Sequence, residues 1–167
     1  MPIIKVFDIP KILPKCVLPK HILSHCYLYK EVKSRKASLF AWICLSKYID
    51  LKKVRFAESG RPYSIDDQQY FSLSHSNDKV AIAIYNKPIG VDIELVKPNK
   101  LLAKRLLTKQ EYQQYLAVNN PDLWFTKYWT KYEAQIKLGV SSNTNEHIKT
   151  SKITDSNHIY IVNTIYY

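Results

Sequence analysis

The sequence predicts an α+β fold, in which antiparallel strands and long helices occur in separate runs along the chain. Two short apolar runs joined by a turn predict a hairpin around residues 71–85, and two more strand-like runs lie after residue 146. Between them, capping signals predict helices over 108–118 and 121–138. With 167 residues, 46% of them hydrophobic, we expect a single domain over 1–167.

The N-terminal third combines extended segments with one long helix. Residues 3–7 predict an edge strand, and prolines at positions 2, 10, 14 and 19 favour turns before any long helix. From 34 to 49, apolar residues surround the helical wheel almost completely, which is typical of a helix buried on most sides. We expect this helix to form the core of the first half.

The middle of the chain predicts three strands. A turn at 59–62 precedes a half-buried strand over 71–75, where polar and apolar residues alternate. Turn residues then lead into an almost wholly apolar strand over 80–85. A further strand should hold 90–95 and end before Pro98.

The C-terminal part predicts helices followed by strands. A helix is expected over 100–107. Thr108 and Glu111 have the spacing of a capping box, so the next helix should begin there. Asn120 and Pro121 provide an N-cap and a first helical residue for the helix after it.

That last helix should stop at Gly139, because glycine is favoured just past a helix end. A polar loop over 140–146 is expected to follow. Residues 147–153 and 158–166 are rich in Ile, Thr, Val and Tyr, and they predict the two final strands.

Two carboxylates, Asp92 and Glu94, are the most informative pair in the chain. Successive side chains of a strand alternate faces, so these two project the same way while Val91, Ile93 and Leu95 point into the core. Like charges about 7 Å apart along a strand repel unless they are protonated or bridged. A hard cation such as magnesium is the usual bridge, although a solvated acidic face would have the same pattern.

A third carboxylate is offered by the last helix. Trp129, Glu133 and Lys137 are each four residues apart, so they follow one side of that helix. Glu133 is therefore a candidate ligand, although Glu before Lys at this spacing is also the ordinary surface salt-bridge arrangement. His75 has two interpretations as well, because local Ser hydroxyls could satisfy it in place of a ligand.

Four motifs, taken together and in order, are much more specific than any of them alone. The motifs are Arg61-Pro62, Ser72-Leu73-Ser74-His75-Ser76, Gly90-Val91-Asp92-Ile93-Glu94, and Trp129 with Glu133-Ala134 and Lys137. In this order they resemble the 4′-phosphopantetheinyl transferases, and the resemblance is clearest from about 34 to 139. The closer resemblance is to the larger surfactin-synthetase-activating type. That type has two pseudo-symmetric halves in one chain, which here would span about 1–88 and 89–167, each an antiparallel sheet packed on a long helix.

The resemblance implies transfer of the phosphopantetheine arm of coenzyme A to a serine of a carrier protein, with release of 3′,5′-ADP. By that analogy, Asp92, Glu94 and Glu133 hold magnesium, or manganese, on the pyrophosphate. Glu133, or a water beside the metal, would accept the serine proton, and Lys137 would stabilise or protonate the leaving phosphate.

The same resemblance assigns contacts to coenzyme A. Ser74 and His75 match residues that touch its phosphate, and Arg61 with Pro62 matches the segment lining its adenine. Arg35 matches a basic phosphate contact. For Glu111 two explanations stay open, since the family has an active-site glutamate there and the capping box already accounts for the residue.

Two departures from the family pattern matter. The family usually has Lys directly before the metal-binding Glu, whereas this chain has Tyr132, with Lys131 one place earlier. A one-residue step on a helix turns a side chain by about 100°, so Lys131 is not an obvious substitute. Tyr132 therefore motivates a rival, a catalytically weak relative that only binds coenzyme A or a carrier protein. The chain also ends about a strand earlier than the family pattern.

The net charge of the chain limits the classes of binding partner that we expect. The net charge of +11 suits an acidic carrier protein, and a basic nucleic-acid-binding module is the other rival. Against it, the aromatic residues follow no recognised RNA-binding pattern. No apolar run is long enough to span a membrane, and Cys16, Cys26 and Cys44 are expected to be reduced and structural. We expect a cytoplasmic monomer.

Overall fold

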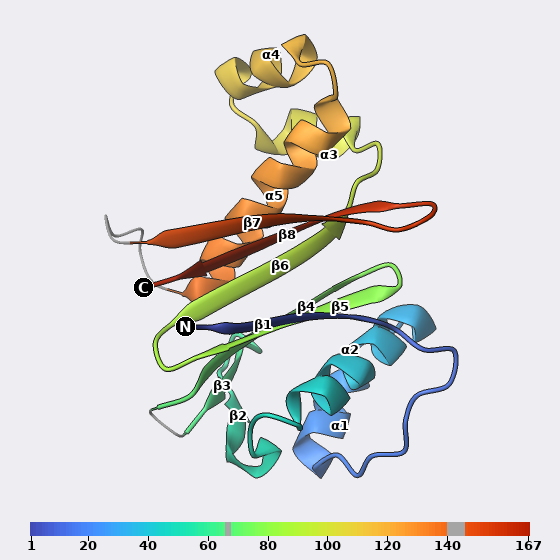
Figure 1. The fold of residues 1–167 in the computed structure, drawn as a ribbon, viewed down its shortest axis with the longest axis vertical. Helices are drawn as coiled ribbons and strands as arrows, with labels where there is room; N and C mark the ends of the chain where they lie inside the picture. Colours follow the sequence, from blue (N-terminus) through green and yellow to red (C-terminus); the bar gives the residue numbers. More distant parts are fainter. Residues whose placement is uncertain (66–67, 140–145) are drawn as a thin grey trace.

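The computed structural model describes residues 1–65, 68–139 and 146–167, and it confirms the predicted α+β class. Two three-stranded antiparallel sheets and a two-stranded ribbon are accompanied by five α-helices (Figure 1). No helix among these residues is long and apolar enough to cross a bilayer. The predicted loop over 140–146 lies, apart from its last residue, outside the described part of the chain.

The first sheet has the order β1-β5-β4. Its strands are β1 (Ile3–Asp8), β4 (Tyr70–Ser76) and β5 (Lys79–Tyr85), and β1 lies at an edge as predicted. The turn between β4 and β5 places Asn77 at φ 54°, a left-handed conformation that asparagine tolerates better than most residues.

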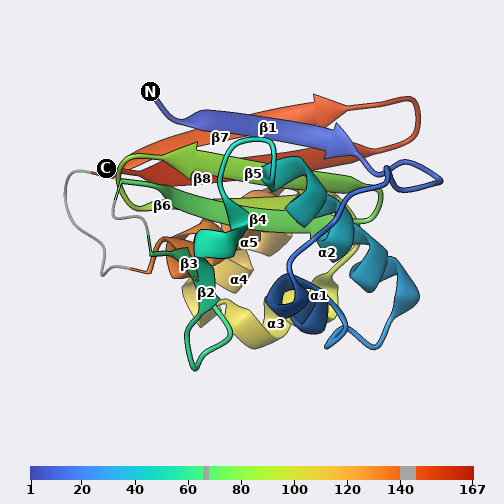
Figure 2. The ribbon, with the colours of Figure 1, turned by 90° about the horizontal axis from the view of Figure 1, so that it is seen from below.

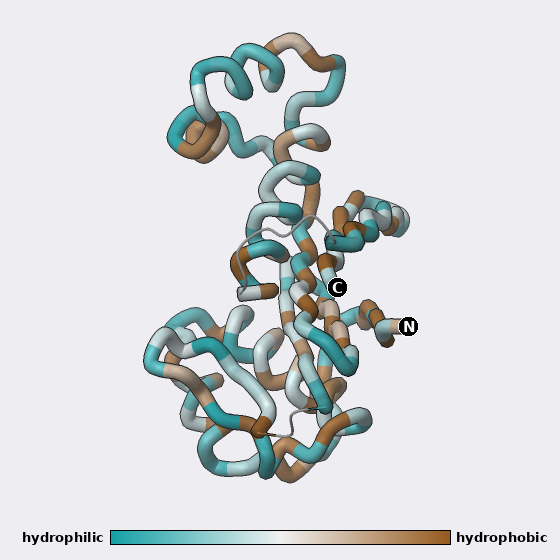
Figure 3. Tube along the Cα trace, turned by 90° about the vertical axis from the view of Figure 1, so that its left-hand side faces the viewer, coloured by the Kyte–Doolittle hydropathy of each residue, from teal (hydrophilic) through white to brown (hydrophobic). Residues whose placement is uncertain are grey.

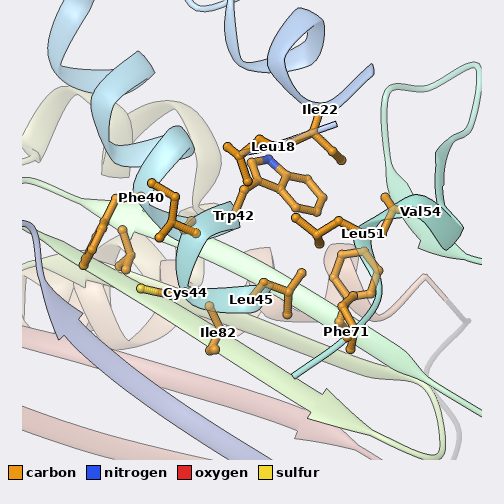
Figure 4. Close-up of a cluster of buried hydrophobic side chains, with 14 of the residues drawn as sticks. Leu18, Ile22, Phe40, Trp42, Cys44, Leu45, Leu51, Val54, Phe71 and Ile82 are labelled. Atoms are coloured by element: carbon orange, nitrogen blue, oxygen red, sulfur yellow. The ribbon is translucent and has the colours of Figure 1, made fainter. Parts of the chain in front are cut away.

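One long helix, α2 (Val32–Leu45), packs on β4 and β5 of this sheet. Its eight buried residues include Phe40, Trp42 and Leu45, which form the main core together with β-strand residues (Figure 4). The predicted bounds of 34–49 were wrong at both ends. The helix closes in tight turns, in which Ser46 Oγ donates to Ile43 O and the Tyr48 amide donates to Leu45 O.

Short elements that the sequence did not predict complete the first half. A seven-residue helix, α1 (Lys20–Cys26), follows Pro19 and buries Ile22 and Cys26 against α2. The ribbon is formed by β2 (Val54–Phe56) and β3 (Pro62–Ser64), and a 3₁₀ turn, η1 (Leu51–Lys53), precedes it. The predicted turn at 59–62 joins the two strands of this ribbon.

The second sheet has the order β6-β8-β7, with β6 (Ile89–Leu95), β7 (His147–Thr154) and β8 (Ile159–Tyr166). Helix α5 (Pro121–Leu138) packs on β6 and β8. Asn120 caps it by accepting from the Leu123 amide, and Gly139 ends it at φ +76°, both as predicted.

Two smaller helices, α3 (Lys100–Leu106) and α4 (Lys109–Ala117), lie beside the first turns of α5. They share a small core with α5, formed by Ala103, Leu107, Tyr115 and Phe125. Figure 3 shows hydrophilic stretches in this helical segment, which extends beyond the sheets.

The two sheets also pack against each other. Along β5, Ile82 and its same-face neighbours point toward α2, whereas Ala81 and Ala83 point to the opposite face. There the alanines meet Val91 and Ile93 of β6, so both faces of β5 are buried. The helices lie on one side of the strands, with β1 and β7 farthest from them (Figure 2). That the two halves are pseudo-symmetric repeats, divided near residue 88, stays a prediction.

The three cysteines are free. Cys26 and Cys44 are buried in the main core, and burial raises the pKa of the Cys44 thiol to about 11. A structural role fits these two, whereas Cys16 is exposed.

Candidate active site

The site forms where β4 of the first sheet lies beside β6 of the second. Serine side chains join the two strands. The Val91 amide donates to Ser72 Oγ at 3.0 Å, and the Leu95 amide donates to Ser76 Oγ at 3.1 Å. Because both pairs advance together along the chain, the strands run in the same direction. We call Ser72, Ser74 and Ser76 the serine ladder.

Helix α5 reaches this seam because Gly90 has no side chain. A Cβ added at Gly90 would lie 2.0 Å from Ala134 O and 2.7 Å from Leu138 N, both in the backbone of α5. Ala134 is fully buried at this contact. The close approach of helix and strand therefore brings Glu133 and Lys137, which flank the contact on α5, to the carboxylates of β6.

Buried hydrogen bonds also connect α5 to β8, the strand next to β6. Asn163 of β8, which lies opposite Asp92 in the sheet, donates to Thr130 Oγ1 at 2.6 Å and to Lys127 O at 3.3 Å. Asn163 is 1% exposed. Its side-chain amide therefore connects α5 to the strand next to β6. This connection helps to fix how Glu133 and Lys137 lie relative to the carboxylates of β6.

Asp92 is the most buried acid of the site, with 2% of its surface exposed. Its Oδ1 accepts from Lys137 Nζ at 2.6 Å and from Ser74 Oγ at 2.7 Å. Its Oδ2 is also buried, and within the described residues it has no hydrogen-bond partner. A buried carboxylate oxygen without a partner is costly, so this atom calls for a cation or a bound donor.

Glu94 and Glu133 line the same open cavity as Asp92, which has a volume of about 550 Å³. Burial, and then the charge of Asp92, raises the pKa of Glu94, whereas the hydrogen bond from Ser76 opposes this shift. Burial also raises the pKa of Glu133, against the lowering effect of Lys137. Three partly desolvated carboxylates and one ammonium group thus converge on one cavity.

The carboxylates are not in a closed coordination shell. Within the described residues, only Asp78, Asp155 and His158 form a group of three whose ligand atoms all lie within 4.8 Å of one another. One member of that group is already paired with a side-chain ammonium, because Lys79 Nζ lies 3.2 Å from Asp155 Oδ2.

In the cavity, the ammonium group of Lys137 pairs with Asp92 and so occupies a position where a metal cation would be expected. The donor set fits a hard divalent ion, since it offers carboxylate oxygens and the partnerless Asp92 Oδ2.

His75 and Ser74 line the cavity from β4. The ring of His75 makes an edge contact with Tyr29, at 5.9 Å between centroids. Burial and the nearby Lys137 ammonium lower the pKa of His75, so its imidazole is neutral near pH 7. A neutral imidazole can donate one hydrogen bond to a ligand without adding charge.

Arg61, directly before β3, and Pro62, the first residue of β3, reach the site from the ribbon. Pro62 lines the main cavity, and both residues line an adjoining cavity of about 560 Å³ that also reaches Glu133 and Lys137. Arg61 Nη2 donates to Leu138 O at 3.0 Å, and the guanidinium lies against Gly139, where a Cβ would be 1.5 Å from Nη1. The arginine therefore fastens the ribbon to the C-terminal end of α5.

Two predicted site residues lie outside these cavities. Arg35 donates from Nε and Nη2 to Tyr29 O, at 3.2 and 3.0 Å, and lies over the Tyr27 ring. It thus supports Tyr29, which lines the main cavity. Glu111 forms the predicted capping box with Thr108 at the start of α4, and these hydrogen bonds lower its pKa.

Tyr132, the departure from the family pattern, also lies away from the cavity. It is 48% exposed, and its ring lies beside that of Trp129, with 5.6 Å between centroids. Lys131 is exposed as well. Within the described residues, the ammonium group that pairs with Asp92 is that of Lys137.

Some residues of the cavity were not predicted from sequence. Tyr29, Ser38 and Trp42 line it from the N-terminal segments. No local pattern singles them out, because their place depends on how α2 packs on the first sheet. Ser76 belongs to the serine motif seen in the sequence, but no role was predicted for it there, and the structure shows that it donates to Glu94.

The comparisons with known proteins point to one family of transferases. Residues 88–159 match the model of the 4′-phosphopantetheinyl transferase superfamily. Sfp, a 4′-phosphopantetheinyl transferase of Bacillus subtilis, is 37% identical over 95 residues, which cover 53% of this chain and 42% of Sfp.

Two further relatives carry the same transferase name. The gsp protein of Aneurinibacillus migulanus is 32% identical over 120 residues, covering 65% of this chain and 50% of the relative. The psf-1 protein of Bacillus pumilus is 40% identical over 72 residues, covering 41% and 31%. The chain thus spans half or less of the length of these relatives. The matched segment carries both acids of β6 and the whole of α5. Over this segment the chain is similar to the 4′-phosphopantetheinyl transferase superfamily, and it is similar to Sfp, gsp and psf-1.

Proposed function

We propose that this chain transfers the 4′-phosphopantetheine arm of coenzyme A to a serine of an apo carrier protein. The observation that carries the proposal is the cavity that gathers Asp92, Glu94, Glu133 and Lys137, with one buried oxygen of Asp92 lacking a partner. In the reaction, a bond forms between the serine oxygen and the phosphorus of the arm. The bond from that phosphorus to the leaving 3′,5′-ADP breaks.

Asp92, Glu94 and Glu133 are the residues that would hold a magnesium ion, or manganese in its place. When bound, such an ion neutralises charge on the pyrophosphate oxygens. Oxygen ligands accept either metal, so the donor set does not favour one of them.

Glu133 is suited to accept the proton of the attacking serine. Its carboxylate lines the cavity, and burial raises its pKa, which makes it a stronger base than an exposed glutamate. Lys137 is suited to the leaving group, because its ammonium already lies inside the cavity. A fixed positive charge at that position would stabilise the negative charge that builds up on the departing phosphate.

Coenzyme A would bind along the wall formed by β4 and the ribbon. Ser74 and His75 line the main cavity, and Arg61 and Pro62 line the adjoining one. The main cavity falls within the range of about 300–1,000 Å³ common for ligand pockets. A nucleotide at the adjoining cavity would leave the phosphate end of the cofactor at the carboxylates.

The proposed acceptor is an acidic carrier protein, because its charge would be opposite to the net charge of +11 on this chain. Opposite charges speed encounter at low ionic strength. A monomer is proposed, since the carboxylates and Lys137 come from one chain, and the cytoplasm is the proposed compartment.

The experiment is to incubate the chain with coenzyme A, MgCl₂ and an apo carrier protein, and to weigh the carrier by mass spectrometry. The wild-type chain should add the phosphopantetheine mass. Asp92→Ala should add none while the chain stays folded, because the role of Asp92 is to bind metal.

Asp122→Ala is the matched control. It removes a carboxylate from the first turn of the same helix, roughly 16 Å along the axis from Glu133. The control should transfer like the wild type. If the wild type modifies no carrier of fatty-acid or peptide-synthetase origin, the transferase proposal fails. Coenzyme A binding without transfer would instead favour a catalytically weak relative.

A further inference from the structure

Ser76, at the end of β4, touches a proposed metal ligand. Its Oγ accepts from the Leu95 amide at 3.1 Å and donates to Glu94 Oε2 at 2.9 Å. A serine hydroxyl has a single proton to donate. Because the amide already uses Oγ as an acceptor, that proton is directed at the carboxylate, and the hydroxyl fixes Glu94 relative to the backbone of its own strand.

The three members of the serine ladder differ in what they hold. Ser72 accepts from the Val91 amide, and no hydrogen bond from it to a carboxylate is present within the described residues. Ser74 contacts both Asp92 and Lys137, so its removal would alter two charged groups at once. Ser76 contacts only one charged group in the described structure, which makes it the clearest test of the ladder's effect on the site.

The position of Ser76 also links the site to the packing of the two sheets. Ser76 belongs to the first sheet and Glu94 to the second, so the hydrogen bond between them depends on the register of β4 against β6. Glu94 is half-buried and lines the cavity close to Asp92. Without a donor from β4, its carboxylate could rotate away from Asp92, since two like charges repel.

We propose that Ser76 is a positioning residue, which holds the Glu94 carboxylate in place for a divalent cation shared with Asp92. This inference rests on the proposed function, in which Glu94 is a metal ligand. Residues that orient metal ligands typically change metal affinity by about 10- to 100-fold when they are removed.

The test is the affinity of the whole chain for Mn²⁺, measured by calorimetry and by the electron paramagnetic resonance signal of the free ion, with and without coenzyme A. Ser76→Ala should raise the Kd for Mn²⁺ by roughly 10-fold or more. Ser72→Ala is the matched control. Both variants remove an acceptor of a β6 amide, so both should lose similar thermal stability, but only Ser76→Ala should weaken metal binding.

Two further variants separate positioning from folding. Ser76→Thr keeps the hydroxyl and suits a strand, so it should restore the wild-type Kd. In a Glu94→Ala background, Ser76→Ala should have no additional effect on the Kd, because the carboxylate through which it acts is gone. If Ser76→Ala does not fold, the Ser76→Thr variant and a Ser76→Cys variant, whose thiol is a weaker donor, still give a graded test.

Several results would overturn the inference. An unchanged Kd in Ser76→Ala, with normal transfer by the wild type, would refute positioning while leaving the proposed function intact. Equal weakening in Ser72→Ala would show a general packing effect. A wild-type chain that neither binds Mn²⁺ nor modifies a carrier would refute this inference and the proposed function together.

Discussion

Replacing Gly90 by Ala should disconnect α5 from the carboxylates of β6. The added Cβ would lie 2.0 Å from Ala134 O and 2.7 Å from Leu138 N, whereas ordinary contact begins at 3.4 Å. Both atoms belong to the backbone of α5, so the clash cannot be relieved by moving a flexible side chain. The helix must therefore shift by about 1 Å or more, in a region that is otherwise close-packed.

That shift has two measurable costs. Overpacking a buried contact typically costs about 1–3 kcal/mol, which lowers the melting temperature of a chain of this size by roughly 2–12 °C. A displacement of about 1 Å at a catalytic group can cost about 100-fold in rate. Since Glu133 and Lys137 move with the helix, we expect Gly90→Ala to lose about 100-fold in kcat/KM for carrier modification at a temperature where it is still folded.

The control is Ile89→Val, which removes one methyl group from the neighbouring buried position of the same strand. It should cost about 0.5–1.5 kcal/mol without pushing on α5, and its kcat/KM should stay near wild type. Thermal unfolding followed by circular dichroism, together with carrier modification followed by mass, measures both quantities. A folded Gly90→Ala variant with wild-type kcat/KM would refute the claim that this close contact sets the position of Glu133 and Lys137.

Three further predictions concern single residues of or near the site. Glu94→Gln should raise the melting temperature at neutral pH without metal. The pKa of Glu94 is raised by burial and by Asp92, so the ionised form costs stability above that pKa, and the gain should vanish below pH 4.5, where the acid is protonated in both folded and unfolded states. A gain that persists at low pH would contradict this. Glu111→Ala should lower the melting temperature slightly through loss of the capping box but leave kcat/KM unchanged, and a large loss of kcat/KM would favour an active-site role instead. Tyr132→Lys should change kcat/KM by less than about 10-fold, since the residue is exposed beside Trp129. A larger gain in kcat/KM would show that the absence of the family's lysine at this position lowers the activity of the chain.

Local signals predicted most of the second half of the fold. The helix from Asn120 to Gly139 was predicted from its cap, its first proline and its terminal glycine, each of which acts through the nearest backbone groups. The strand predicted over 90–95, from the break at 86–88 and from Pro98 after it, is present as Ile89–Leu95. Short elements such as α1 were missed, because seven residues carry too little periodic signal and their stability comes from packing on α2.

The acidic part of the site was visible in the sequence for the same reason. Strand alternation places Asp92 and Glu94 on one face, and helical spacing places Glu133 and Lys137 on one side of α5. What brings the two sets together could not be predicted from local patterns. That meeting depends on Gly90 allowing the helix onto the strand and on Asn163 holding it there, and both are tertiary contacts.

The most direct test of the metal site is a crystal of the chain grown with coenzyme A and MnCl₂, with data collected at the manganese absorption edge. We predict an anomalous peak bounded by Asp92, Glu94 and Glu133, with Lys137 moved off Asp92 Oδ1 toward the phosphates. A peak only at Asp78, Asp155 and His158, or no manganese peak beside a bound coenzyme A, would show that Asp92, Glu94 and Glu133 do not form the metal site.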